Sequence, residues 1–83
     1  MDNIARTQKQ LGSIVRRYRK HKGMSQGTLG SKSSLRQATI SSIENGESDA
    51  SLTTMMDILA ALDLELVVRP RSKGSDTKIE DIF

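Results

Sequence analysis

The sequence contains no cysteine, one proline, one histidine and almost no aromatic side chains, since the total is one tyrosine and one phenylalanine. Without cysteine it can form neither a disulfide nor a thiolate metal site, which fits a reducing compartment. No apolar run reaches the 18 residues expected of a membrane span, and the first residues lack the apolar core of a secretory signal. We therefore expect a small soluble cytoplasmic protein without a membrane partner.

Residue types used in catalysis are also scarce. His21 is the lone histidine, no glycine-rich phosphate loop is present, and no serine has a plausible base beside it. Acid–base or nucleophilic catalysis needs such groups in combination. The sequence predicts that the chain is not an enzyme and that it uses no metal and no cofactor.

Charge is distributed unevenly along the chain. Residues 1–36 carry nine Lys or Arg and one acid, whereas residues 37–68 carry six acids and no Lys or Arg. This asymmetry suggests one face for a polyanion and another for a different partner. A solvated helix surface is the alternative, and charge alone does not decide between them.

Hydrophobic periodicity predicts an all-α domain. Leu11, Ile14, Val15 and Tyr18 recur at the spacing of one helical stripe, and Ile40 and Ile43 do so in a shorter segment. Ser25 is a good N-cap, and Ser51 or Thr53 caps the last helix. The expected helices span residues 7–21, 25–33, 36–45 and 52–62.

Two glycines lie inside the second predicted helix, where each costs about 1 kcal/mol relative to alanine. We expect another helix to cross close to Gly30, where a larger side chain would not fit. Gly27 has no evident structural purpose, unless backbone must approach a ligand there.

The segment after the last helix, LELVV at residues 64–68, is β-branched and alternating, and predicts a short strand. A single strand leaves its backbone groups unpaired. We therefore expect it to pair with the same strand of a second copy in a homodimer. This organisation gives a domain at residues 7–69 and a flexible tail at residues 70–83.

The third predicted helix has an unusual polar face. Its exposed positions carry small or amide side chains and no acid, namely Arg36, Gln37, Ala38, Ser41 and Ser42. A helix that enters the major groove must carry small side chains on the face that meets the bases. Arg can then donate hydrogen bonds to guanine, Gln can bond adenine, and Ala can contact the methyl group of thymine. Two short helices joined by a turn, the second with this face, predict a helix-turn-helix that binds double-stranded DNA.

The stretch GMSQGTLGSKSSLRQATISSIENGES, residues 23–48, resembles the helix-turn-helix of the Xre/Cro family of bacterial and phage repressors. MSQ and ATISSIENG at this spacing carry the likeness, which covers residues 7–63. Two positions depart from the family pattern: Ser34 stands for the turn glycine, and Gly30 for an alanine. RQATIS and SLTTMMDILAALDLEL are further similar to the HipB antitoxins, the partners of HipA-type kinase toxins.

The resemblance implies roles for particular residues. Base edges would be contacted by Arg36, Gln37, Ala38, Ser41 and Ser42. Phosphates would be contacted by Ser25, Gln26 and Asn45. Arg19 and Glu44 occupy the places of a structural ion pair. Among Lys9, Arg16, Arg17, Lys20 and Lys22, we expect one or two phosphate contacts at most.

The tail ends in KIEDIF, in which Phe83 is the only phenylalanine. A terminal aromatic on a tether is a plausible anchor for a pocket on another protein. The resemblance to HipB antitoxins implies that Ile82 and Phe83 contact a toxin. A disordered end is the alternative.

These observations predict a dimeric repressor that binds a pseudo-palindromic operator with half-sites about one helical turn apart. It would autoregulate its operon and hold a HipA-like kinase toxin inactive. One alternative is a free-standing Xre-family regulator without a toxin. Another is a protein-interaction module whose helix-turn-helix no longer binds DNA.

Overall fold

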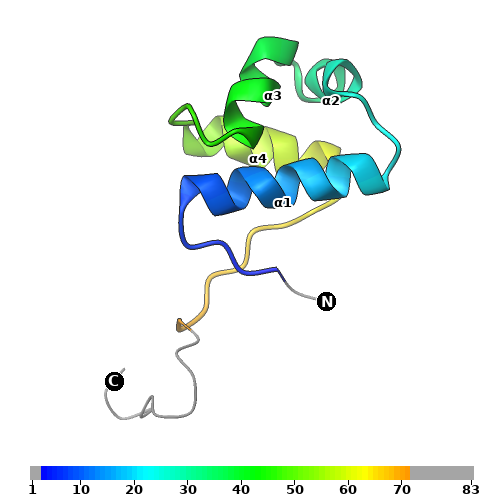
Figure 1. Ribbon diagram of the computed structural model, residues 1–83. Coiled ribbons are helices and arrows are strands. Elements are labelled where there is room, and N and C mark those ends of the chain that lie inside the picture. Colours follow the sequence, from blue (N-terminus) through cyan, green and yellow to red (C-terminus); the bar gives the residue numbers. More distant parts are fainter. Residues whose placement is uncertain (1–2, 72–83) are drawn as a thin grey trace.

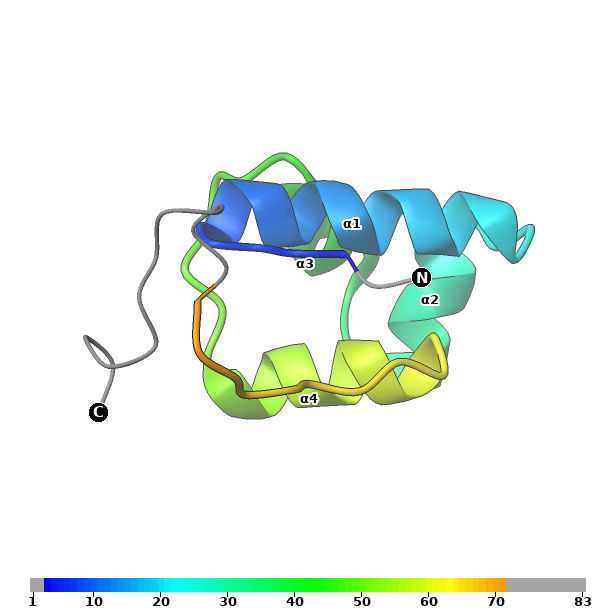
Figure 2. The ribbon, with the colours of Figure 1, turned by 90° about the horizontal axis from the view of Figure 1, so that it is seen from below.

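The computed structural model describes residues 3–71, which contain four α-helices and no strand. These are α1 (Gln8–His21), α2 (Gln26–Ser33), α3 (Gln37–Glu44) and α4 (Leu52–Ala61). In Figure 1, α2 and α3 lie side by side above α1 and α4. Figure 2, turned by 90° and seen from below, shows α1 and α4 with α2 lying between them at one end. The predicted all-α helix-turn-helix fold is confirmed.

Three of the four helices, α1, α2 and α4, begin where the sequence supplies a side-chain cap. Thr7, Ser25 and Ser51 each accept a hydrogen bond from the backbone N–H three residues later, at 3.0–3.1 Å. Each bond satisfies one of the amide donors that an α-helix leaves free in its first turn. The last cap is therefore Ser51, one of the two candidates, and the helix bounds agree with the predicted ranges to within one residue.

The hydrophobic core lies between the four helices. Its fully buried side chains are Val15, Leu29, Ile40, Ile58 and Leu62, so every helix contributes at least one, with Leu62 directly following α4. Fully burying a side chain of this size contributes about 1.5–3 kcal/mol each. Together these contacts fix α3 on the other helices with its remaining face turned outward.

Two glycines allow α3 to approach its neighbours closely. A Cβ on Gly12 of α1 would fall on the Ile43 carbonyl oxygen of α3. A Cβ on Gly30 of α2 would stand 2.7 Å from the Leu35 carbonyl oxygen in the turn before α3. Real Cβ atoms are not found so near backbone oxygen, so either side chain would move α3. Gly30 thus has the close crossing that the sequence suggested, whereas Gly12 was not anticipated.

The turn between α2 and α3 passes through a left-handed residue. Ser34 has a φ of 60° and ψ of 37°, and the next N–H, on Leu35, donates to the Gly30 carbonyl at 2.8 Å. This conformation is unfavourable for a residue with a Cβ and is usually given to glycine. Ser34 therefore bears the strain expected from its departure from the usual turn glycine. Gly23 and Gly46 adopt positive φ after α1 and α3.

The predicted strand at residues 64–68 is not present in the single chain. Residues 64–71 follow α4 without regular secondary structure and turn back beneath the helices (Figure 1). A strand is defined by hydrogen bonds to a neighbouring strand, and residues 3–71 of one chain contain no strand beside this segment. Leu66, Val67 and Val68 stay exposed, Val68 to 91%.

Candidate nucleic-acid interface

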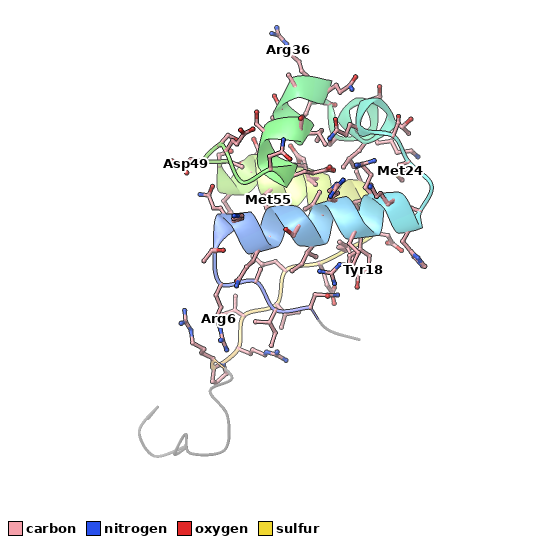
Figure 3. The ribbon with its side chains drawn as sticks, viewed as in Figure 1. Arg6, Tyr18, Met24, Arg36, Asp49 and Met55 are labelled. Atoms are coloured by element: carbon pink, nitrogen blue, oxygen red, sulfur yellow. The ribbon has the colours of Figure 1, made fainter. Side chains whose placement is uncertain are left out.

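The outward face of α3 carries the residues predicted to read DNA bases. Arg36, the N-cap of α3, and the next two residues, Gln37 and Ala38, are exposed, whereas Ser41 and Ser42 are half-buried. Figure 3 shows the Arg36 side chain projecting away from the protein beyond the end of α3. The structure therefore places Arg36, Gln37 and Ala38 at the N-terminal end of α3. The two serines lie further along the helix.

The only acid of α3 is withdrawn from this face. Glu44 is 5% exposed, and its two carboxylate oxygens accept hydrogen bonds from Arg19 of α1, from Nε at 2.6 Å and from Nη2 at 3.0 Å. This bidentate, charge-assisted geometry is the strongest that an Arg–carboxylate pair makes. The pair leaves the exposed surface of α3 without a negative charge that would repel phosphate.

Arg19 and Glu44 belong to a network that joins three helices. Gln26, at the start of α2, donates from Nε2 to Glu44 Oε1 at 3.2 Å, and Arg19 Nη1 donates to the Met24 carbonyl at 2.8 Å. Among residues 3–71, every buried side-chain nitrogen or oxygen has a hydrogen-bond partner. The network fixes the start of α2 and the end of α3 on the same part of α1, so both helix ends keep a defined relative position.

The three residues predicted to contact phosphate lie in different surroundings. Ser25 is exposed, and its hydroxyl caps α2 by accepting from the Thr28 N–H at 3.0 Å. Asn45 is exposed and directly follows α3. The Gln26 side chain is half-buried, and its amide nitrogen donates to Glu44. This nitrogen is therefore engaged within the protein. Sequence reasoning missed this contact because nothing local links positions 26 and 44.

Apart from the buried Arg19, the basic side chains of α1 are exposed, and one of these, Arg17, bonds the N-terminal segment. Arg17 Nη1 donates to Asn3 Oδ1 at 2.9 Å, and Asn3 Nδ2 donates to the Tyr18 hydroxyl at 2.8 Å. These bonds hold the N-terminal segment along α1. Arg17 is therefore tied to this segment, whereas Lys9, Arg16, Lys20 and Lys22 are exposed.

Other kinds of site find little support within residues 3–71. No group of histidine and acidic side chains gathers at the spacing a metal ion needs, and no helix among these residues is long and apolar enough to cross a membrane. The predicted toxin-contacting residues Ile82 and Phe83 lie outside the described residues, as does most of the predicted tail.

Comparisons with known proteins agree with this geometry. The helix-turn-helix family HTH_3 matches residues 15–68. Antitoxin HipB of Escherichia coli O6:H1 (strain CFT073) is 37% identical over 71 residues, which are 86% of this chain and 76% of that protein. Antitoxin HipB of Escherichia coli K12 is 32% identical over 71 residues, 86% of this chain and 81% of that protein.

Solved structures give the same result. A chain of the HipA-HipB-O2-O3 complex superposes with a TM-score of 0.76 at 30% identity, covering 87% of this chain and 100% of that one. The restriction-modification controller protein C.AhdI from Aeromonas hydrophila gives a TM-score of 0.68 at 33% identity, covering 70% of this chain and 88% of that one. The similarity therefore extends over the whole helical domain.

Proposed function

This chain belongs to the Xre-type helix-turn-helix family, and from this premise we propose that it represses transcription by binding a pseudo-palindromic operator in its own promoter. It is a DNA-binding regulator similar to HipB antitoxins, and not an enzyme. The observation that carries the proposal is the acid-free outer face of α3. Arg36 and Gln37 are exposed at its tip, while Glu44 is buried against Arg19.

Base recognition is assigned to Arg36, Gln37 and Ala38, with Ser41 and Ser42 as shorter contacts on the same face. Phosphate contacts are assigned to Ser25 and Asn45, and to the backbone at Gln26 where α2 begins, because a helix N-terminus presents free amides to an anion. Arg19 and Glu44 are assigned a structural role and no DNA contact, since their hydrogen-bond network joins α1, α2 and α3.

We expect Gln37→Ala to cost about 1–3 kcal/mol at the operator and to leave nonspecific affinity unchanged. The physical reason is that an amide bonds adenine at two atoms, whereas phosphate contacts ignore sequence. The measurement is fluorescence anisotropy, near physiological salt, with a duplex from upstream of the gene and with a scrambled duplex. Wild type should prefer the upstream duplex by about a thousandfold or more.

The matched control is Gln10→Ala on α1, where the glutamine is also exposed but accepts a bond from the Arg6 N–H. It should leave both affinities unchanged. Equal losses on both duplexes for Gln37→Ala would contradict base reading. Weak, equal binding by wild type would place the operator elsewhere.

A homodimer is the second part of the proposal. An open groove of about 740 Å³ lies between the N-terminal segment, α1 and residues 63–71, and its apolar lining includes Ile4, Leu11 and Leu66. Exposed Val67 and Val68 adjoin it. A second copy that paired residues 64–68 with their equivalents would cover this surface and supply the missing strand partner.

Replacing Val67 and Val68 together by Glu should convert the dimer to a monomer with little change in helix content. Both side chains are exposed in the single chain, so the charges cost little there, whereas between two copies they would be buried or set against each other. Light scattering after gel filtration measures the mass. Ser13→Glu on the exposed face of α1 is the control, and a double variant that stays dimeric would refute this interface.

The third part is binding of a HipA-like kinase toxin, supported by the identity with HipB antitoxins. Deleting residues 75–83 should weaken this binding and spare DNA binding, because Ile82 and Phe83 would serve as a tethered anchor. The assay is surface binding to the kinase encoded beside the gene. An unchanged affinity would show that the tail does not contact the toxin. Absence of such a kinase would favour a free-standing regulator.

A further inference from the structure

Gly27 is a glycine without a structural need in this fold. It is the second residue of α2, and its φ is not positive, unlike those of Gly23 and Gly46. Glycine inside a helix is unfavourable relative to alanine, so an ordinary surface position would not be expected to keep one. No tight crossing explains it either, in contrast to Gly12 and Gly30.

The space beside Gly27 is bounded by two side chains of the proposed DNA interface. A Cβ at this position would stand 3.6 Å from Gln37 Oε1 and 3.8 Å from Ser25 Oγ, which are ordinary contact distances. Alanine therefore fits without displacing anything. A longer side chain would extend over the Gln37 amide, because that amide is the nearest group.

The Gln37 amide makes no hydrogen bond to any other residue in the part of the chain that the structure describes. Gln37 is exposed, and no bond within residues 3–71 uses its side chain. Its oxygen can still accept and its nitrogen can still donate. Both are required to bond adenine, which offers a donor at N6 and an acceptor at N7.

We propose that Gly27 is a specificity-determining position, whose missing side chain leaves the Gln37 amide uncommitted so that it reads adenine with both atoms. This inference rests on the proposed function, in which Gln37 contacts a base. A hydrogen-bond donor at position 27 would occupy Gln37 Oε1. This bond would hold the amide with its oxygen toward position 27 and its N–H donors toward the groove, where guanine, with acceptors at O6 and N7, would compete with adenine.

The test compares Gly27→Gln, Gly27→Met and Gly27→Ala with wild type. Glutamine places an amide two carbons beyond Cβ, within reach of Gln37, whereas methionine has similar length without a strong donor and alanine adds only the methyl group. The probe is a duplex that the wild-type protein selects from a randomised library, remade with each base pair at the position where Gln37→Ala loses discrimination. Affinities are measured by anisotropy on the full chain.

Gly27→Gln should lower the preference for adenine over guanine at that position about tenfold, the order expected when one bond of a bidentate base contact is lost. Gly27→Met and Gly27→Ala should keep the preference, and Gly27→Ala should also raise Tm. In the free protein, the side-chain amide protons of the glutamine introduced by Gly27→Gln should exchange slowly with solvent in NMR measurements, because they donate to Gln37 Oε1.

An unchanged preference in Gly27→Gln would overturn the inference while leaving base reading by Gln37 intact. An equal loss in Gly27→Met would also overturn it, because bulk and not hydrogen bonding would then be responsible. If Gln37→Ala alters discrimination at no base pair, base reading by Gln37 fails, and the inference fails with it. If no sequence is selected from the library, operator binding itself is refuted.

Discussion

Arg19→Met is expected to lower the free energy of unfolding by about 3–5 kcal/mol, the usual cost of removing one partner from a buried ion pair. The Glu44 side chain is 1% exposed, so its carboxylate could not be hydrated without opening the core. Of its hydrogen bonds to side chains, only the one from Gln26 would remain. The Met24 carbonyl would lose the Arg19 guanidinium as well.

Urea unfolding followed by circular dichroism measures this change. Arg17→Met is the matched control on the same helix, because Arg17 is exposed and bonds only the N-terminal Asn3; it should cost less than about 1 kcal/mol. The double variant Arg19→Met with Glu44→Leu should recover most of the loss, since well-packed apolar residues often replace a buried pair at little cost. A single variant as stable as wild type would show that the pair contributes nothing to the fold.

Gly12→Ala is expected to lower the free energy of unfolding by about 3 kcal/mol, at the upper end of the cost of overpacking. The added methyl group would meet the Ile43 backbone carbonyl, and a backbone atom cannot turn aside as a flexible side chain can. The α1–α3 distance must therefore increase. For a domain of this size the drop in Tm should be more than about 10 °C.

Gly27→Ala is the matched control, because it makes the same change inside a helix where the new methyl group has room. It should raise stability by up to about 1 kcal/mol through helix propensity alone. Calorimetry on both variants measures Tm and shows whether only Gly12→Ala is destabilised. Equal stabilisation by both would mean that α1 and α3 do not cross closely at Gly12. Because α3 carries the proposed base-reading residues, Gly12→Ala should also reduce operator affinity.

The helices themselves were predictable because their signals are local. An apolar stripe every three to four residues marked α1, and the caps at Ser25 and Ser51 marked the starts of α2 and α4. The positive φ of Ser34 was implied by the family resemblance, because Ser34 stands where that family has a turn glycine. In each case the local conformation depends on residues that are close together in the sequence.

The strand at residues 64–68 shows where local signals stop being sufficient. β-branched residues favour extended backbone, but a strand exists only when another strand accepts and donates its hydrogen bonds. One copy of the chain does not provide that neighbour within residues 3–71. The pattern therefore specified an extended segment, and its pairing stays a prediction about the dimer.

For this protein the sequence alone determined four helices, the N-caps of α2 and α4, and a polar outer face on α3. The pairing of Glu44 with Arg19 was suggested by the family resemblance. Only the tertiary structure decided that Gln26 joins this pair and that Gly12 sets the contact between α1 and α3. It also decided that Gly27 borders Gln37. The physical reason is that periodicity and capping act within a few residues, whereas distances between helices depend on where their axes cross, which only packing of the whole core fixes.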